Sequence, residues 1–280
     1  MTTIGVIGIE NSHVDHFVRH LNSEDRHPDF KITHLVGGEP DRQAKLQEAG
    51  GITELVAEPA DLVGKVDAAI ICTRDGGKHA EQALPLLKAG MPVLVDKPLA
   101  ASVADAQAML DAAKENNALL VSSSALRNVP EMADLSSATA DRGATAAIHV
   151  FGPADPDSEY SGLSFYGIHE IEAALQIGGD ADFGDVTVVR GEGSIIASTT
   201  IGGVPTTISF ITKDDEGQVK FFATVVGRHG ITQTPLTLGK DYNAPMLDLF
   251  VDMLKTGKAP IDDATLLRPI QLLEAITSQL

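Results

Sequence analysis

The sequence V-L-V-D-K-P, residues 93–98, places a carboxylate, a lysine and a proline directly after a short apolar run. Such a run is typical of a strand buried in a parallel sheet, and open α/β sheets bind ligands at the carboxyl ends of their strands. Because lysine is almost never buried unpaired, we expect Lys97 to point into a crevice at that edge, held by the restricted backbone before Pro98. A buried ammonium can stabilise negative charge on an oxygen, and its lowered pKa allows it to relay a proton. The alternative is an ordinary surface lysine at a strand end.

A second set of reactive side chains lies on one predicted helix, residues 164–177. Tyr166, His169 and Glu172 recur every three residues and therefore share one side of this helix. We favour His169 as a general base that Glu172 orients, with Tyr166 as a hydroxyl relay or substrate contact; a structural histidine at a helix start is the alternative. The apolar stripe of the helix consists of Ile168, Ile171 and Leu175.

Three histidines, His13, His16 and His20, recur on one face of another predicted helix, with Asp15 and His27 nearby. Imidazoles at this spacing could bind zinc or nickel. A helix that follows the first strand of a doubly wound sheet runs away from the ligand edge, so a solvated face is the preferred interpretation. We predict no metal site.

The predicted strands and helices that position these residues follow one pattern in the first part of the chain and another in the second part. The first part alternates strands with helices, which predicts a doubly wound parallel sheet, whereas the second part has alternating segments typical of antiparallel strands. We therefore expect an α/β protein with two domains: residues 1–123, a Rossmann dinucleotide-binding domain, and residues 124–280, an α+β substrate-binding and oligomerisation domain. Hairpin turns are predicted at Gly202-Gly203 and at residues 214–217. The first part has predicted strands over residues 4–9, 31–37, 67–73, 93–95 and 118–122. The second part has predicted strands over residues 146–151, 185–190, 193–200, 206–211 and 219–226.

The composition indicates a globular protein with 43% hydrophobic and 21% charged residues. A net charge of −18 argues against nucleic acid or an anionic membrane as a partner, because both require clustered lysine and arginine. The single cysteine, Cys72, suits a reducing compartment, and the N-terminus has no export or membrane segment. We expect a cytoplasmic protein.

Three segments of the sequence resemble segments of a known family. They are I-G-V-I-G at residues 4–8, V-D-A-A-I-I-C-T at residues 66–73, and K-A-G-M-P-V-L-V-D-K-P at residues 88–98. With H-A-E-Q-A-L from His79 and P-M-L-D-L-F from Pro245, the chain resembles the Gfo/Idh/MocA oxidoreductases over nearly its whole length. The resemblance implies a Rossmann domain, a C-terminal domain on an open, mostly antiparallel sheet, and nicotinamide-dependent redox chemistry on sugars or polyols. It also implies that Lys97 lies beside the nicotinamide and the reacting carbon.

Departures from the family pattern occur at both halves of the expected site. His169 and Gly167 match the family's helix, but Phe165 occupies the position of its usual aspartate. Arg127 matches a position that often holds arginine, and we expect it to contact substrate together with Glu172 or else to pair with a carboxylate.

The dinucleotide fingerprint is reduced to its first glycine, Gly8, and Glu10 stands where backbone should approach the pyrophosphate. Asn11 and Ser12 could cap the next helix and offer donors. The acid that binds the adenosine ribose is replaced by Gly37 or Gly38, and Arg42 is nearby, so both NAD and NADP are admissible. The resemblance adds further cofactor-binding residues: Thr73, His79, Asp96 and Lys97.

The sequence therefore predicts an NAD(P)-dependent oxidoreductase acting on a sugar, an inositol-like polyol or a derivative. Two alternatives stay open: a non-catalytic ligand-binding or regulatory protein that has lost tight dinucleotide binding, and a metal-dependent lyase or isomerase that uses the histidines. An apolar open sheet face would need covering, so we expect a homodimer or homotetramer.

Overall fold

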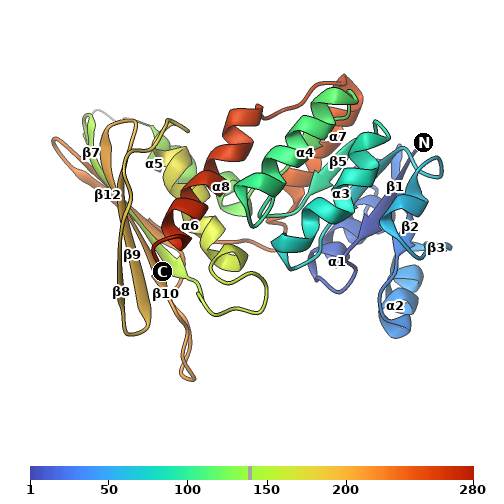
Figure 1. Cartoon of the computed structure of the whole chain (residues 1–280), viewed down its shortest axis with the longest axis horizontal. Helices are drawn as coiled ribbons and strands as arrows, with labels where there is room; N and C mark the ends of the chain where they lie inside the picture. Colours follow the sequence, from blue (N-terminus) through green and yellow to red (C-terminus); the bar gives the residue numbers. More distant parts are fainter. Residues whose placement is uncertain (138–140) are drawn as a thin grey trace. The chain divides into compact units, whose positions relative to one another are not determined.

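The computed structural model describes residues 1–137 and 141–280, which form two compact units (Figure 1). The first unit consists of residues 1–123 and 243–266, and the second of residues 124–242 and 267–280. The sequence prediction placed residues 243–266 with the C-terminal domain, whereas their contacts assign them to the first unit.

Six parallel strands form the sheet of the first unit, in the order β3-β2-β1-β4-β5-β6. In this order the direction of winding reverses between β1 and β4, as in doubly wound dinucleotide-binding sheets. The predicted α/β class is confirmed. The strands are β1 Thr2–Ile7, β2 Phe30–Val36, β3 Glu54–Val56, β4 Ala68–Ile71, β5 Val93–Val95 and β6 Leu120–Val121.

Helices that connect these strands cover both faces of the sheet, because right-handed crossovers place the connections before and after the reversal on opposite sides. α1 contacts α2 on one side, and α3 contacts α4 on the other (Figure 1). α7 returns to this unit and packs Phe250 and Val251 into a core that includes Phe17. The helices are α1 His13–Val18, η1 Arg19–Ser23 (a π-helix), α2 Pro40–Gly50, η2 Pro59–Leu62, η3 Gly76–Lys78, α3 His79–Lys88, α4 Val103–Glu115 and α7 Ala244–Thr256.

The second unit is built on a six-stranded sheet in the order β12-β11-β7-β10-β9-β8. Neighbouring strands are antiparallel except for the central pair β7 and β10, which run parallel. The predicted mostly antiparallel sheet is confirmed. The strands are β7 Thr145–Pro153, β8 Thr187–Gly191, β9 Ser194–Ile201, β10 Val204–Ile211, β11 Phe222–Gly227 and β12 Ile231–Pro235.

One face of this sheet packs against helices, with α6 on β7 and β10 and α5 on β11 and β12. The helices are η4 Ala125–Asn128, α5 Glu131–Ser136, α6 Ser164–Ile177 and α8 Asp263–Thr277. Only the part of α8 from Leu267 onward belongs to this unit. None of the helices in residues 1–137 and 141–280 has the length and apolar character to cross a bilayer.

The two predicted turns have different outcomes. Gly202 and Gly203 do join the antiparallel strands β9 and β10, as predicted. Residues 214–217 form a tight turn closed on Asp214, but the flanking strands β10 and β11 both pair with β7 instead of with each other. The second turn is therefore not a hairpin between neighbouring strands.

Candidate functional site

The carboxyl ends of β1, β4 and β5 bring together most of the predicted cofactor-binding residues of the first unit. Gly8 follows β1, Thr73 lies two residues after β4, and Asp96 follows β5. The backbone N–H of Asp96 donates to the carbonyl of Ile71 at 2.8 Å, so the D-K-P segment is joined to the end of β4. This edge includes the point where the winding reverses, which is where such sheets bind ligands.

Gly8 is required by close packing between β1 and β4. Its φ is +78°, and a Cβ added there would lie 2.1 Å from the backbone nitrogen of Thr73. Only glycine fits that conformation at that separation, so the first glycine of the fingerprint keeps its structural function.

Gly64 provides a matched control for this position, because its φ is +76° and a Cβ there would meet nothing within 4 Å. We expect Gly64→Ala to cost about 1 kcal/mol from backbone strain alone. Gly8→Ala should cost at least about 2 kcal/mol more, because the added atom strikes backbone. Urea unfolding followed by circular dichroism measures both variants, and equal losses would contradict the clash.

Polar bonds from outside the loop hold residues 9–11 in place. Arg42 donates through Nε to the carbonyl of Ile9 at 2.6 Å and through Nη2 to the carbonyl of Asn11 at 3.0 Å, and it also pairs with Asp15. The Asn11 side chain donates to the carbonyl of Cys72 at 2.8 Å. The Asn11 amide thus braces the loop, and its contact with a phosphate stays a prediction.

Glu10 is turned toward the end of β4, where its carboxylate accepts a hydrogen bond from the backbone nitrogen of Arg74 at 3.1 Å. Ser12 lies before α1 and makes no side-chain cap on it. The predicted cap at Ser12 is therefore wrong, because Asn11 instead accepts the hydrogen bond of the His13 backbone nitrogen at 3.0 Å.

Asp96 is buried and directed toward His13, whose Nδ1 lies 2.7 Å from Oδ2 of the carboxylate. Burial alone would raise the pKa of Asp96, but the charge and hydrogen bond of His13, followed by the charge of Lys97, outweigh it and lower the pKa to about 2. Asp96 is therefore an ionised, buried carboxylate next to Lys97. Its contact with a cofactor stays a prediction.

The depressed pKa of Asp96 makes its contribution to stability dependent on pH. The ionised form stabilises the fold fully above about pH 4, and this contribution is lost as the pH falls toward the folded-state pKa of about 2. We expect Asp96→Asn to lower the free energy of unfolding by about 2 kcal/mol at about pH 6. The gap to the wild type should shrink by more than half at about pH 2.5, as measured by chemical denaturation; a constant gap would contradict this assignment.

Lys97 is 7% exposed, and a cis peptide bond joins it to Pro98. The next carbonyl, that of Pro98, lies 2.8 Å from Nδ1 of His79, while Nε2 of His79 lies 2.7 Å from the carbonyl of Thr73. The fully buried His79 therefore links the D-K-P segment to the end of β4. Its direct contact with a cofactor stays a prediction.

A cavity of about 300 Å³ opens at the carboxyl ends of β1, β2 and β4. Three predicted cofactor-binding residues line it, Gly8, Gly37 and Thr73, and so does Glu10. Gly38 lines the cavity as well, and it packs closely on Ile9, because a Cβ there would lie 2.5 Å from that side chain. The glycine-lined space at the reversal point fits one part of a dinucleotide.

In the second unit, His169 is 6% exposed and its Nδ1 lies 2.7 Å from the hydroxyl of Ser124. Glu172, which the sequence suggested as the partner of His169, accepts hydrogen bonds from the Ser124 backbone nitrogen at 2.9 Å and from Nε of Arg127 at 2.7 Å. Ser124 thus connects the histidine to the carboxylate, and the role of Glu172 in orienting His169 stays a prediction.

Arg127 is buried between two carboxylates. Besides Glu172, it forms a bidentate pair with Asp180 at 3.0 and 2.9 Å. Burial would lower the pKa of Arg127, but Glu172 and Asp180 outweigh it and raise that pKa. Of the two predicted roles for Arg127, the structure shows the carboxylate pairing; its contact with substrate stays a prediction.

Tyr166 is 39% exposed and lines a second cavity, of about 370 Å³, that lies wholly within this unit. Phe165, which replaces the family's aspartate, packs against Tyr160 and Tyr166 with ring centroids 4.8 and 5.0 Å apart. The aromatic wall faces polar groups, among them Asp155 and Lys213. Such a pocket combines apolar faces with a few polar groups, as small-molecule sites do.

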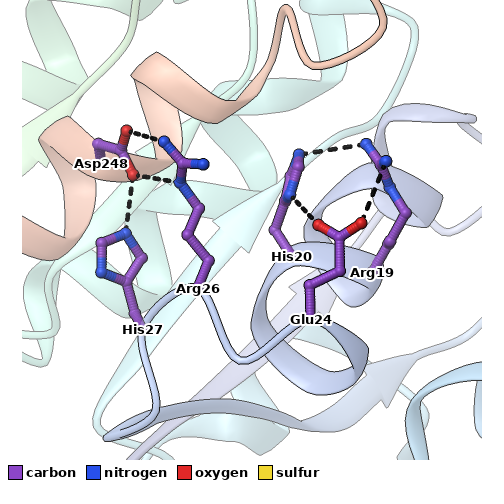
Figure 2. Close-up of polar contacts among 6 residues, drawn as sticks. All are labelled: Arg19, His20, Glu24, Arg26, His27 and Asp248. Atoms are coloured by element: carbon purple, nitrogen blue, oxygen red, sulfur yellow. Dashed lines mark hydrogen bonds and ion pairs between the residues drawn. The ribbon is translucent and has the colours of Figure 1, made fainter.

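Three of the histidines considered as metal ligands, His13, His20 and His27, pair with separate carboxylates in the first unit. Figure 2 shows His20 paired with Glu24 and His27 paired with Asp248, and the hydrogen bonds measure 2.9 and 2.8 Å. His13 pairs with Asp96. Within residues 1–137 and 141–280, no three His, Cys, Asp or Glu side chains are grouped to hold a metal ion. The pairing gives the metal-dependent alternative no support.

Comparison with known proteins relates the N-terminal part of the chain to a described family. Residues 2–124 match the family described as "Oxidoreductase family, NAD-binding Rossmann fold". The N-terminal part of the chain is thus similar to the Rossmann domain of the Gfo/Idh/MocA oxidoreductases.

Two named relatives align with parts of the chain. The chain is 32% identical to a 1,5-anhydro-D-fructose reductase of Ensifer adhaerens over 35% of its own length and 30% of the relative. It is 27% identical to a myo-inositol 2-dehydrogenase of Thermotoga maritima over 58% of its own length and 50% of the relative. The aligned parts thus span half or less of these relatives.

The fold extends over the whole chain. The crystal structure of GenD2 from gentamicin A biosynthesis, in complex with NAD, matches with a TM-score of 0.85 over 99% of this chain and 93% of that one. At 16% identity, this similarity shows the fold alone.

Proposed function

We propose that the protein is an NAD(P)-dependent oxidoreductase that transfers hydride between a nicotinamide and a ring carbon of a sugar, an inositol-like polyol or a derivative. The observation that carries this proposal is the buried Lys97 beside an ionised, buried Asp96, at the edge where the family's Rossmann domain binds its cofactor. The names of the aligned relatives, a reductase and a dehydrogenase of carbohydrate-type compounds, support it.

In this proposal, residues of the chain bind the dinucleotide and accept the proton of the substrate hydroxyl. Gly8, Gly37 and Thr73 line the cavity that would take part of the cofactor, and the bound nicotinamide would supply or accept the hydride. The Lys97 ammonium stabilises the oxygen that becomes an alkoxide. His169 takes the hydroxyl proton; Ser124 engages its Nδ1, so proton exchange falls to Nε2.

The cavity of the second unit supports the proposed substrate class. The rings of Tyr160, Phe165 and Tyr166 offer apolar surface to the C–H faces of a sugar or cyclitol, while Asp155 and Lys213 can bind its hydroxyl groups. These contacts support a carbohydrate or polyol substrate.

A titration tests the proposed function. NAD(H) and NADP(H) are added to the purified protein and binding is followed by nicotinamide fluorescence. Binding of at least one form, followed by turnover with a sugar or polyol, is expected. If neither form binds at millimolar concentration, the oxidoreductase proposal is refuted.

The second candidate function is a non-catalytic ligand-binding protein. Glu10, which lines the cofactor cavity, and Phe165, which stands where the family resemblance implies an aspartate, favour it. Binding of a sugar without binding of any nicotinamide would establish this alternative.

We propose further that the second unit forms a homodimer or homotetramer through the open face of its sheet. That face is half-exposed and carries a stacked pair, Phe151 and Phe222, with ring centroids 5.1 Å apart. Ile196 and Val189, opposite each other on β9 and β8, are 40% and 67% exposed. Sedimentation velocity tests this proposal, and a monomer at micromolar concentration would contradict it. The cytoplasmic location stays a prediction.

A further inference from the structure

The end of β2 lacks the carboxylate that normally binds the adenosine ribose. Val36 is followed by Gly37 and Gly38, with φ of +55° and +87°. No side chain projects from these two positions, so β2 offers the cofactor cavity only backbone at this point. An acid for the ribose must come from a neighbouring element.

The neighbour of β2 is β3, which runs parallel to it in the register His34↔Glu54, Leu35↔Leu55 and Val36↔Val56. The ladder continues beyond the strands, because the Gly37 nitrogen donates to the carbonyl of Val56 at 2.9 Å. In this register Glu58, two residues after β3, corresponds to Gly38, two residues after β2.

Glu58 is fixed in that place and borders the same cavity. Its backbone nitrogen donates to Oδ2 of Asp61 at 3.0 Å, which anchors the start of η2. Gly37, Gly38 and Glu58 all line the cavity of about 300 Å³. Glu58 thus brings an acidic residue to the cavity where β2 supplies none, and its side chain also accepts the backbone N–H of Asp61 in the capping box of η2.

The charges around the cavity disfavour an additional phosphate. Its charged lining residues are Glu10, Glu58 and Lys78. Arg42, the cation that the sequence suggested for a 2′-phosphate, already donates to both carboxylate oxygens of Asp15, at 2.8 and 2.6 Å, and to the carbonyls of Ile9 and Asn11. Binding a phosphate through Arg42 would break bonds that hold the loop.

We propose that Glu58 takes over the ribose-binding role of the missing acid, and that the protein consequently selects NAD(H) over NADP(H). This inference rests on the proposed function. The Glu58 carboxylate accepts hydrogen bonds from the ribose hydroxyls, which are strong because one partner is charged. The same carboxylate repels the 2′-phosphate of NADP(H).

The test is calorimetric titration of the apoprotein with NAD+ and with NADP+, which requires no turnover. The wild type should bind NAD+ at least about tenfold more tightly than NADP+. Glu58→Gln should weaken NAD+ binding by about tenfold and reduce the preference between the two forms, because a neutral amide neither accepts as strongly nor repels phosphate. Glu39→Gln, an exposed acid after Gly38 that does not line the cavity, is the matched control and should leave both affinities unchanged.

Each outcome decides between the two proposals. Equal affinity of the wild type for both forms, or an unchanged preference in Glu58→Gln, overturns the role of Glu58 and leaves the oxidoreductase proposal in place. Binding of neither form overturns the proposed function and this inference together.

Discussion

Lys97→Ala is expected to lower kcat by about 10²–10⁴-fold while the affinity for the dinucleotide stays within a few-fold of the wild type. In the proposed reaction the lysine acts on the substrate oxygen in the transition state, so its removal costs rate more than binding. Steady-state kinetics with the best sugar or polyol substrate, together with the fluorescence titration, measure the two effects separately.

A surface lysine of the same unit provides a control for the effect of removing one positive charge from the protein. Lys88, at the end of α3, is exposed, and Lys88→Ala should leave kcat unchanged. Retained turnover in Lys97→Ala would refute the catalytic role. A parallel loss of dinucleotide binding would instead make Lys97 a cofactor-binding residue.

Arg127→Ala should be the most destabilising single change in the second unit. The guanidinium is buried between Glu172 and Asp180, and Glu172 is itself only 5% exposed. Removing one partner of a buried ion pair leaves the other charge without compensation, which typically costs about 3–5 kcal/mol. Urea denaturation at neutral pH measures the loss.

Arg190 supplies the matched comparison, because it pairs with Asp157 at 3.6 Å on the surface of the same unit. The side chains of that pair are 51% and 81% exposed, so water and salt screen it, and Arg190→Ala should change stability by less than about 1 kcal/mol. A loss in Arg127→Ala as small as that in Arg190→Ala would mean that Glu172 becomes hydrated or protonated without cost.

The parts of the fold that the sequence predicts well are those with a strong local pattern. The apolar run at residues 93–95 is strand β5, and the periodic stretch at residues 164–177 is helix α6, each with the predicted bounds. β3 was missed because it spans three residues, two of them exposed, Glu54 and Leu55. Its strand character depends on pairing with β2, which no local pattern records.

The sequence identifies candidate site residues by their type, but it does not identify most of the side chains that they contact in the structure. His169 and Glu172 are both buried on α6, although helical spacing assigned them to a polar side. The residue that joins them is Ser124, 45 positions from His169. A serine among three consecutive serines carries no distinguishing signal in sequence. Likewise, the pairing of His13 with Asp96 depends on two chain segments that only the folded sheet brings together.

The hydrogen bonds between Arg42 and the loop after β1 have a consequence for recognising similar loops in other sequences. Glycine spacing identifies loops whose shape comes from backbone freedom, whereas here shape comes from a tether supplied by the second helix, 31 residues from Asn11. A search by glycine spacing alone overlooks loops of this kind. The informative pattern is a distant one: an asparagine after the first strand, an aspartate one turn later, and an arginine on the next helix.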